Sequence, residues 1–95
     1  GTLETLQAAT DLELMTAPDR DALVAAWCLA TKVRNAVYSV TGRPSDQVPT
    51  DFEVLSSVAF LFGYSPDQRA QLTEDYLRIT RKARTVVERI FYEWE

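Results

Sequence analysis

The stretch LTEDYLRITRKARTVVERI, residues 72–90, decides the fold. Its apolar positions recur in alternating steps of four and three, which is the spacing of one face of an α-helix. These positions are Leu72, Tyr76, Ile79, Ala83, Val86 and Ile90. Upstream, Ser65 and Gln68 have the spacing of a capping box, which marks a helix start. We therefore predict a helix over 66–94 that forms the main spine of the core.

A second long helix is predicted earlier in the chain. Between Pro18 and Thr41 the apolar residues again recur every three or four positions. They are Leu23, Trp27, Ala30, Val33, Val37 and Val40. Thr16 is a candidate N-cap, and Gly42 is a candidate C-terminal stop. These signals predict a helix over 17–41.

The segment TGRPSDQVPTDFE, residues 41–53, separates that helix from the next one. Gly42 can adopt the positive φ that ends a helix, and Pro44 cannot continue one. Thr50 and Glu53 have the spacing of a reciprocal capping box. The segment is therefore predicted to be a specified corner that delivers the chain to a new helix.

The third helix is predicted over 51–62, with Gly63 as its stop. Two leucines near the amino end indicate a further short helix over 2–10. No stretch is typical of a strand, and no internal repeat is present. The sequence thus predicts an all-α single domain over 1–95, a helical bundle of about four helices in which the two long ones are antiparallel.

The composition is that of a folded soluble protein. Of the 95 residues, 46% are hydrophobic and 25% are charged, which is too apolar for a disordered tail. Charges interrupt every long apolar run, so no membrane span is expected. No basic and apolar leader stands at the amino end, and a cytoplasmic location is the default expectation.

The residue types limit the chemistry. The chain has no histidine and a single cysteine, so an intrachain disulfide and a structural zinc site are excluded and the usual general base is missing. Cys28 is expected to be a small buried residue. The acid pairs at 11–13 and 51–53 have the spacing of magnesium-binding carboxylates, but we interpret both as helix-start residues. No catalytic, cofactor-binding or metal-binding residue is predicted in this chain.

A local basic segment stands out against a net charge of −4. Its cations are Arg78, Arg81, Lys82 and Arg84. They can form a basic surface for an anionic partner, or a solvated face compensated by acids four residues away, as Glu74 is from Arg78, Glu88 from Arg84 and Glu93 from Arg89. Nucleic-acid binding is not expected, because the chain is acidic and its aromatic residues are expected on core stripes.

Arg34 and Asn35 interrupt the inner region of the second helix. The planar fork of an arginine can clamp a phosphate or a carboxylate of a ligand. Alternatively, Arg34 pairs with Asp46, Asp51 or Asp75 and steadies the loop. Both interpretations remain open from the sequence.

The order RNAVYSVTGRPSDQVPTDFEVLSSVAFLFGY, residues 34–64, followed by DYLRITRKARTVVERIFY, residues 75–92, resembles a known family. It is similar to the extreme carboxyl-terminal helical region of glutamine synthetase adenylyltransferase in its actinobacterial form. The likeness runs from Leu3 to Tyr92. Its most specific parts are Arg34-Asn35, the Gly42–Gln47 loop with Pro49, Gly63-Tyr64 and Thr80-Arg81-x-Ala83-Arg84.

The resemblance implies a cytoplasmic nitrogen-control enzyme with two nucleotidyltransferase halves. One half transfers AMP from Mg·ATP to a tyrosine of glutamine synthetase, and the other half removes it. The family's catalytic Gly-Ser turn and its metal-binding acid pair lie upstream, and nothing in this chain matches them. The resemblance therefore implies that Mg²⁺ and ATP belong to the parent enzyme and that this chain alone is inactive.

The resemblance also implies partners. These are glutamine synthetase, the upstream nucleotidyltransferase domain and, further, a PII-type signal protein. The candidate interaction residues are Arg34, Asn35, Arg43, Asp46, Arg78, Arg81 and Arg84. The alternative is an autonomous helical protein–protein interaction module that reads a nitrogen-signal protein.

Overall fold

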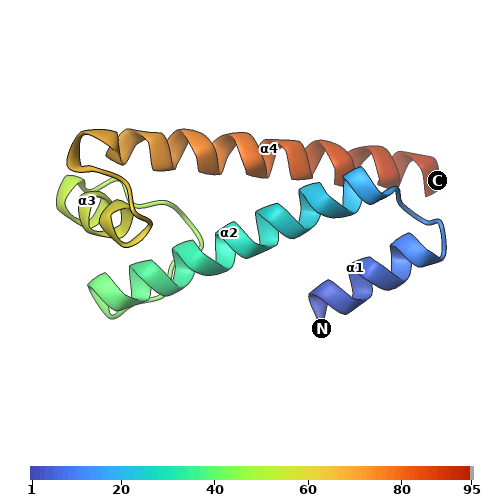
Figure 1. Cartoon of the computed structure of the whole chain (residues 1–95), viewed down its shortest axis with the longest axis horizontal. Coiled ribbons are helices and arrows are strands. Elements are labelled where there is room, and N and C mark those ends of the chain that lie inside the picture. Colours follow the sequence, from blue (N-terminus) through green and yellow to red (C-terminus); the bar gives the residue numbers. More distant parts are fainter. Residues whose placement is uncertain (95) are drawn as a thin grey trace. The chain divides into compact units, whose positions relative to one another are not determined.

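The computed structural model describes residues 1–94, with the backbone alone for Trp94, and this part of the chain contains helices and no strands. The helices are α1 (Thr2–Asp11), α2 (Ala17–Thr41), α3 (Phe52–Leu61) and α4 (Arg69–Trp94), with a 3₁₀ turn at Pro66–Gln68 (Figure 1). The predicted all-α class and the four predicted helices are confirmed. No helix in the described residues is long and apolar enough to cross a bilayer.

The chain divides into two compact units. The first unit contains Gly1–Trp27 and the chain from Arg78 onward, and the second contains Cys28–Leu77. Both long helices contribute to both units, because each of them crosses a unit boundary. That the whole chain forms a single domain stays a prediction.

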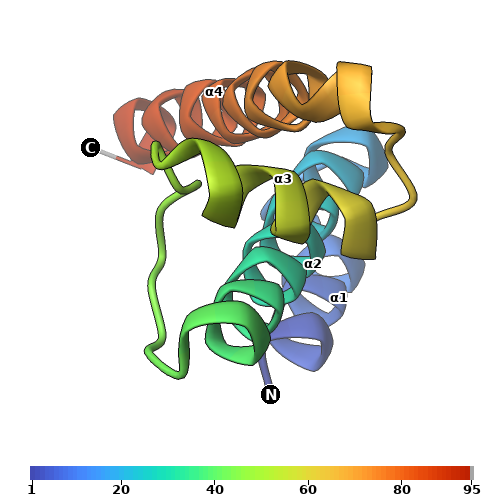
Figure 2. The same ribbon diagram turned by 90° about the vertical axis from the view of Figure 1, so that its left-hand side faces the viewer.

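The core of the second unit is built from three helices. Figure 2 shows α3 crossing the carboxyl-terminal part of α2. The buried residues are Val33, Ala36 and Val37 from α2, Val58 and Ala59 from α3, and Leu72 from α4. Val33, Val58 and Leu72 are fully inaccessible to solvent. Removing such apolar surface from water, at roughly 25 cal/mol per Å², is what holds α3 and the loop before it in place.

The core of the first unit is smaller. Ala22 of α2 packs with Val86 and Ile90 of α4, and Met15 and Leu23 lie partly buried against them. Asp19 pairs with Arg89 in the same unit. The start of α2 therefore lies beside the end of α4, so the two helices are antiparallel in this unit, as predicted.

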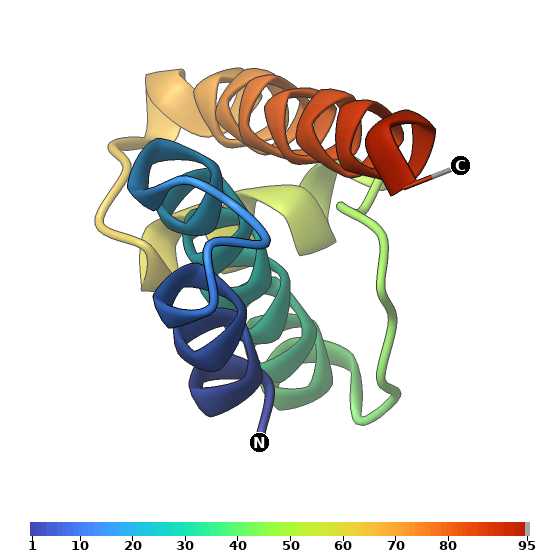
Figure 3. The ribbon, with the colours of Figure 1, turned by 90° about the vertical axis from the view of Figure 1, so that its right-hand side faces the viewer.

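The short helix α1 contributes nothing buried to this core. None of its residues is buried, and Leu3 and Leu12 at its two ends are 41% and 71% exposed. Figure 3 shows the turn over 12–16 that joins α1 to α2. In this turn Glu13 adopts a positive φ of 61°, a conformation that non-glycine residues seldom adopt.

Several predicted helix boundaries are confirmed by their hydrogen bonds. The Asp19 N–H donates to Thr16 Oγ1 at 3.2 Å, which makes Thr16 a working N-cap of α2. Gly63 has a φ of +85° after α3, and the Tyr64 N–H donates to the Ala59 carbonyl at 3.0 Å, which is the pattern of a Schellman end. Gly42 ends α2 with a φ of +73°.

One predicted helix start is wrong, and another differs only in the type of its first turn. The Thr50–Glu53 capping box is wrong, because Asp51 is the N-cap of α3 and its Oδ2 accepts from the Val54 N–H at 3.1 Å. A carboxylate at this position also interacts favourably with the helix dipole. The last helix begins with a 3₁₀ turn, in which Gln68 Oε1 accepts from the Ser65 N–H at 3.2 Å as the predicted box requires.

The helix-start interpretation of the acid pair at 11–13 is also wrong. Asp11 is the last residue of α1, and Glu13 lies in the turn that follows. Cys28 is half-buried rather than buried. The prediction that aromatic residues lie on core stripes fails for Trp27, Phe52 and Phe91, which are 41%, 60% and 62% exposed. The apolar stripes in the sequence are wider than the surface that the neighbouring helices cover.

Candidate interaction site

The loop between α2 and α3 is held by contacts from several directions. Thr41 Oγ1 donates to the Arg43 carbonyl at 3.0 Å and accepts from the Arg43 N–H at 3.1 Å. Ser45 Oγ accepts from the Gln47 N–H at 3.2 Å. Tyr76 of α4 donates its hydroxyl hydrogen bond to the Asp46 carbonyl at 3.0 Å. This hydrogen bond joins the loop to a residue thirty positions later, so the loop is held in place by a tertiary contact with α4.

The structure brings Arg34 to Asp46, one of its three predicted partners. The Nη1–Oδ1 distance is 3.8 Å, and the two side chains are 59% and 85% exposed. A solvated pair at this distance contributes little to stability. The pair leaves the guanidinium of Arg34 largely open to solvent, so its geometry is compatible with steadying the loop and with receiving a further anion.

The other two residues predicted here, Asn35 and Arg43, are in the same unit as this pair. Asn35 is exposed on α2, and its carbonyl accepts from Ser39 Oγ at 3.0 Å. Arg43 is exposed at the start of the loop and lines a hollow of about 430 Å³ with residues of α2, the loop and α3. Arg34, Asn35, Arg43 and Asp46 thus come from one unit, at the loop and the helix before it.

Four clustered basic residues of α4 are all exposed. Arg78, Arg81, Lys82 and Arg84 lie on the part of the helix that belongs to the first unit. Within residues 1–94, Arg81, Lys82 and Arg84 form no ion pair. Arg84 and Glu88 therefore do not form the ion pair that their four-residue spacing favours, although Glu88 lies one helical turn from Arg84.

One long-range polar contact was missed from the sequence. Arg89 donates a hydrogen bond to Asp19 Oδ1, and the Asp19 side chain is only 12% exposed. The bond from Arg89 holds the pKa of the Asp19 carboxyl below its usual range, and the same bond raises the pKa of Arg89. Glu93, the predicted partner, acts on Arg89 only as a nearby negative charge.

Seventy positions separate Asp19 from Arg89 in the sequence, so no local spacing could have revealed the pair. The signal that existed was the alignment of two apolar stripes. If Ala22 faces Val86 and Ile90, an antiparallel arrangement places position 19 opposite the stretch from 89 to 93. The sequence predicted antiparallel helices but not their register.

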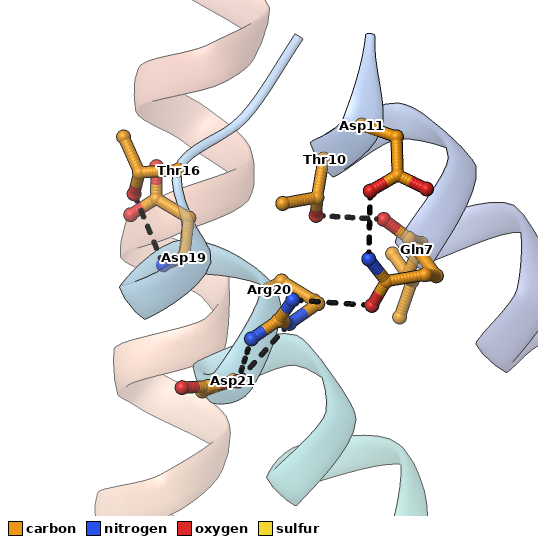
Figure 4. A network of polar contacts seen from close by, with 8 residues as sticks. Gln7, Thr10, Asp11, Thr16, Asp19, Arg20 and Asp21 are labelled. Carbon is orange, nitrogen blue, oxygen red and sulfur yellow. Dashed lines mark hydrogen bonds and ion pairs between the residues drawn. The ribbon is translucent and has the colours of Figure 1, made fainter. Parts of the chain in front are cut away.

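A second polar network ties α1 to α2 (Figure 4). Arg20 donates to Gln7 Oε1 at 3.1 Å and also pairs with Asp21 at 3.0 Å. Gln7 in turn donates to Asp11 Oδ1 at 2.9 Å. These contacts are exposed, so they orient α1 without burying its leucines.

The described residues do not assemble a metal centre. No group of three or more histidine, cysteine, aspartate or glutamate side chains in residues 1–94 is placed to hold a metal ion. The acids at 51 and 53 act at the start of α3, where Asp51 accepts a backbone hydrogen bond.

The geometry defines a helical region in which a hydrogen bond from α4 holds the loop between α2 and α3, and in which α4 carries exposed cations. The family model described as GlnD PII-uridylyltransferase matches residues 1–93, and the chain belongs to this family. No solved structure matches the chain.

Similar proteins are found among actinobacteria. A bifunctional glutamine synthetase adenylyltransferase/adenylyl-removing enzyme of Nocardia farcinica is 50% identical over 91 residues, covering 95% of this chain and 9% of the relative. The enzymes of the same name from Streptomyces avermitilis and Mycobacterium avium are 46% and 40% identical over 92% and 95% of this chain. The chain spans about a tenth of the length of these relatives, 9% in each case. The resemblance seen in the sequence is confirmed.

Proposed function

We propose that this chain is a helical region of a bifunctional enzyme that transfers AMP from ATP to a tyrosine of glutamine synthetase and, in its other half, removes it. The observation that carries the proposal is the 50% identity to an enzyme of that name over 95% of the chain. The enzyme would control nitrogen assimilation in the cytoplasm.

Within that enzyme we assign this region a supporting or docking role. Its polar contacts serve to hold elements together, as the Tyr76–Asp46 hydrogen bond holds the loop and the Asp19–Arg89 pair holds two helices. The candidate partners are glutamine synthetase and the nucleotidyltransferase domain of the same polypeptide. ATP and Mg²⁺ belong to that domain in this proposal, and no step through them is assigned to this chain.

A second candidate function follows from the family model, whose description names a PII-uridylyltransferase. In that alternative the region belongs to an enzyme that transfers UMP from UTP to a PII-type signal protein, and it is the interaction module that receives that protein. The two candidates differ in the nucleotide and in the protein acceptor. They can therefore be separated in one assay.

The test uses the whole enzyme that contains this region. Purified enzyme is incubated with either α-labelled ATP or α-labelled UTP, and with either glutamine synthetase or a PII-type protein as the acceptor. We expect label from ATP on glutamine synthetase only, and no transfer by the 95-residue chain alone. Label from UTP on the PII-type protein would overturn the proposal and support the alternative.

A further inference from the structure

The helix α3 is apolar on its exposed side as well as on its buried side. Seven of its ten residues are apolar, and its one charged residue is Glu53 in the first turn. Val58 and Ala59 are buried in the core of the second unit, whereas Phe60 and Leu61 are 74% and 56% exposed. A helix that is apolar all round is typical of the interior of a larger protein. The exposed side of α3 is therefore a surface that the described residues leave uncovered.

This exposed side forms a hollow with the end of α2, and the hollow lies within the second unit. It has a volume of about 490 Å³, and its walls include Val40 of α2 and Ser57, Phe60 and Leu61 of α3. Ser57 and Leu61 are four residues apart, so they lie on the same face of the helix. None of the described residues that line the hollow is charged. Glu53 is not among them, and it precedes Phe60 by about 10 Å along the helix axis.

The absence of charge restricts what can occupy the hollow. Charged groups steer the encounter of proteins that bind and leave again, and they select the correct partner. Interfaces of that kind are no more apolar than the rest of a protein surface, whereas permanent interfaces resemble a protein core cut in half. The uncharged hollow therefore favours an occupant that stays in place over a protein substrate that must leave after each reaction.

The length of the relatives supplies such an occupant. This chain covers 9% of each of the three relatives described above, so about nine-tenths of each relative is further polypeptide. A segment that is linked to the hollow by the same polypeptide has an effective concentration that reaches the millimolar range. A separate protein or a second copy has to bind from its own solution concentration. Covalent linkage therefore favours the rest of the same polypeptide as the occupant.

We propose that, in the whole enzyme, apolar side chains from the rest of the same polypeptide fill the hollow between α2 and α3, with Phe60 and Leu61 as the main contacts. This inference rests on the function proposed above. The hollow is then a permanent internal interface that fixes this helical region to the remainder of the enzyme. It is not the place where a separate protein substrate docks.

The test measures the accessibility of the hollow in the whole enzyme. Ser57→Cys replaces an exposed hydroxyl with a thiol of nearly the same size, and its reaction with an uncharged maleimide is followed by mass spectrometry of the peptide that contains position 57. We expect this reaction to be at least about tenfold slower in the native enzyme than in the unfolded enzyme. Thr50→Cys is the matched control, because Thr50 is an exposed hydroxyl residue of the same unit outside the hollow. It should react at similar rates in both states, and equal protection of the two positions would overturn the proposal.

A second substitution tests the part played by Phe60. In the Ser57→Cys enzyme, Phe60→Ala should accelerate the reaction at position 57 severalfold, because the occupant loses one of its main contacts. Phe52→Ala is the matched control, since Phe52 is a 60% exposed aromatic residue of the same helix that does not line the hollow. It should leave the reaction rate at position 57 unchanged. Equal acceleration by both substitutions would show a general loosening of α3 and would contradict the assigned contact.

The remaining outcomes distinguish this inference from the function on which it rests. Equal reaction rates at position 57 in native and unfolded enzyme, with normal AMP transfer to glutamine synthetase, would overturn the filled hollow and leave the proposed function intact. Protection that requires added glutamine synthetase, or that disappears when the enzyme is diluted, would assign the hollow to a separate protein or to a second copy and would also overturn the proposal. Protection at position 57 in an enzyme that transfers no AMP would refute the proposed function alone.

Discussion

The Asp19–Arg89 pair is the residue-level contact that locks the start of α2 to the end of α4. Its carboxylate is largely buried, and it also lies beside the N-cap Thr16, whose hydroxyl accepts from the Asp19 N–H. A carboxylate in the first turn of a helix is favoured by the helix dipole as well as by its arginine. The pair therefore couples a helix start to a tertiary contact.

The lowered pKa of Asp19 makes the stability of the chain depend on pH. A carboxyl whose pKa is lower in the folded state stabilises that state fully above its unfolded pKa of about 3.9, and the contribution is lost as the pH falls through the folded pKa. We predict that Asp19→Asn lowers the melting temperature at pH 7. The difference from the wild type should narrow progressively below about pH 4.

Thermal unfolding of both proteins at several pH values between neutral and acid measures this difference. Asp21→Asn is the control, because Asp21 pairs with Arg20 at the surface, where its side chain is 69% exposed. That variant should differ little from the wild type at any pH. A gap between wild type and Asp19→Asn that stays constant down to acid pH would contradict the assigned pair.

At the scale of the element, α3 shows how accurately the first residue of a helix can be predicted from the sequence. The sequence indicated a start within one residue, but two adjacent side chains were able to cap the helix. Thr50 offered a capping box with Glu53, whereas the structure uses the Asp51 carboxylate and leaves Thr50 outside the helix. The choice depends on the backbone of the loop, since Asp51 has the extended ψ of 128° that an N-cap requires.

We predict that Asp51→Ala destabilises the chain by about 0.5–2 kcal/mol, because the Val54 N–H loses its acceptor. Thr50→Ala should change the free energy of unfolding by less than about 0.5 kcal/mol, as expected for a surface substitution that removes no cap. Urea unfolding of the two variants measures both values. A larger loss of stability in Thr50→Ala than in Asp51→Ala would instead support the capping box that the sequence predicted.

At the scale of the whole molecule, the described residues form one buried apolar cluster in each of the two units. The second unit holds the larger cluster around Val33, Val58 and Leu72, and the first unit holds the smaller one around Ala22, Val86 and Ile90. Leu72 is the largest side chain that is fully buried. Its contacts join α4 to α2 and α3, so its removal should lower the stability of the whole second unit.

We predict that Leu72→Ala destabilises the chain by about 2–5 kcal/mol, because it opens a cavity at a site with no exposure. Leu12→Ala makes the same change at a side chain that is 71% exposed, and it should shift stability by less than about 0.5 kcal/mol. Chemical denaturation followed by circular dichroism measures both. Comparable losses of unfolding free energy in the two variants would mean that the Leu12 side chain is buried in solution.

The candidate site was only partly predictable from the sequence. Arg34 was expected to meet one of three acids, and the structure selected Asp46. Arg81, Lys82 and Arg84 were identified from their clustering in the sequence, but their lack of ion pairs within the described residues was not, because Arg84 and Glu88 had a favourable separation. Spacing along a helix shows which side chains can meet, whereas side-chain conformation decides whether they do.

By itself the sequence determined the all-α class, the four helices and most of their ends, because helical periodicity, caps and glycine stops act over a few neighbouring residues. It also determined the family, since the likeness extends over residues 1–93. Only the tertiary structure decided which side of each apolar stripe is covered, and hence that Phe91 is exposed and Asp19 meets Arg89. The physical reason is that burial and long-range pairing depend on the register between helices, which no local pattern in the chain encodes.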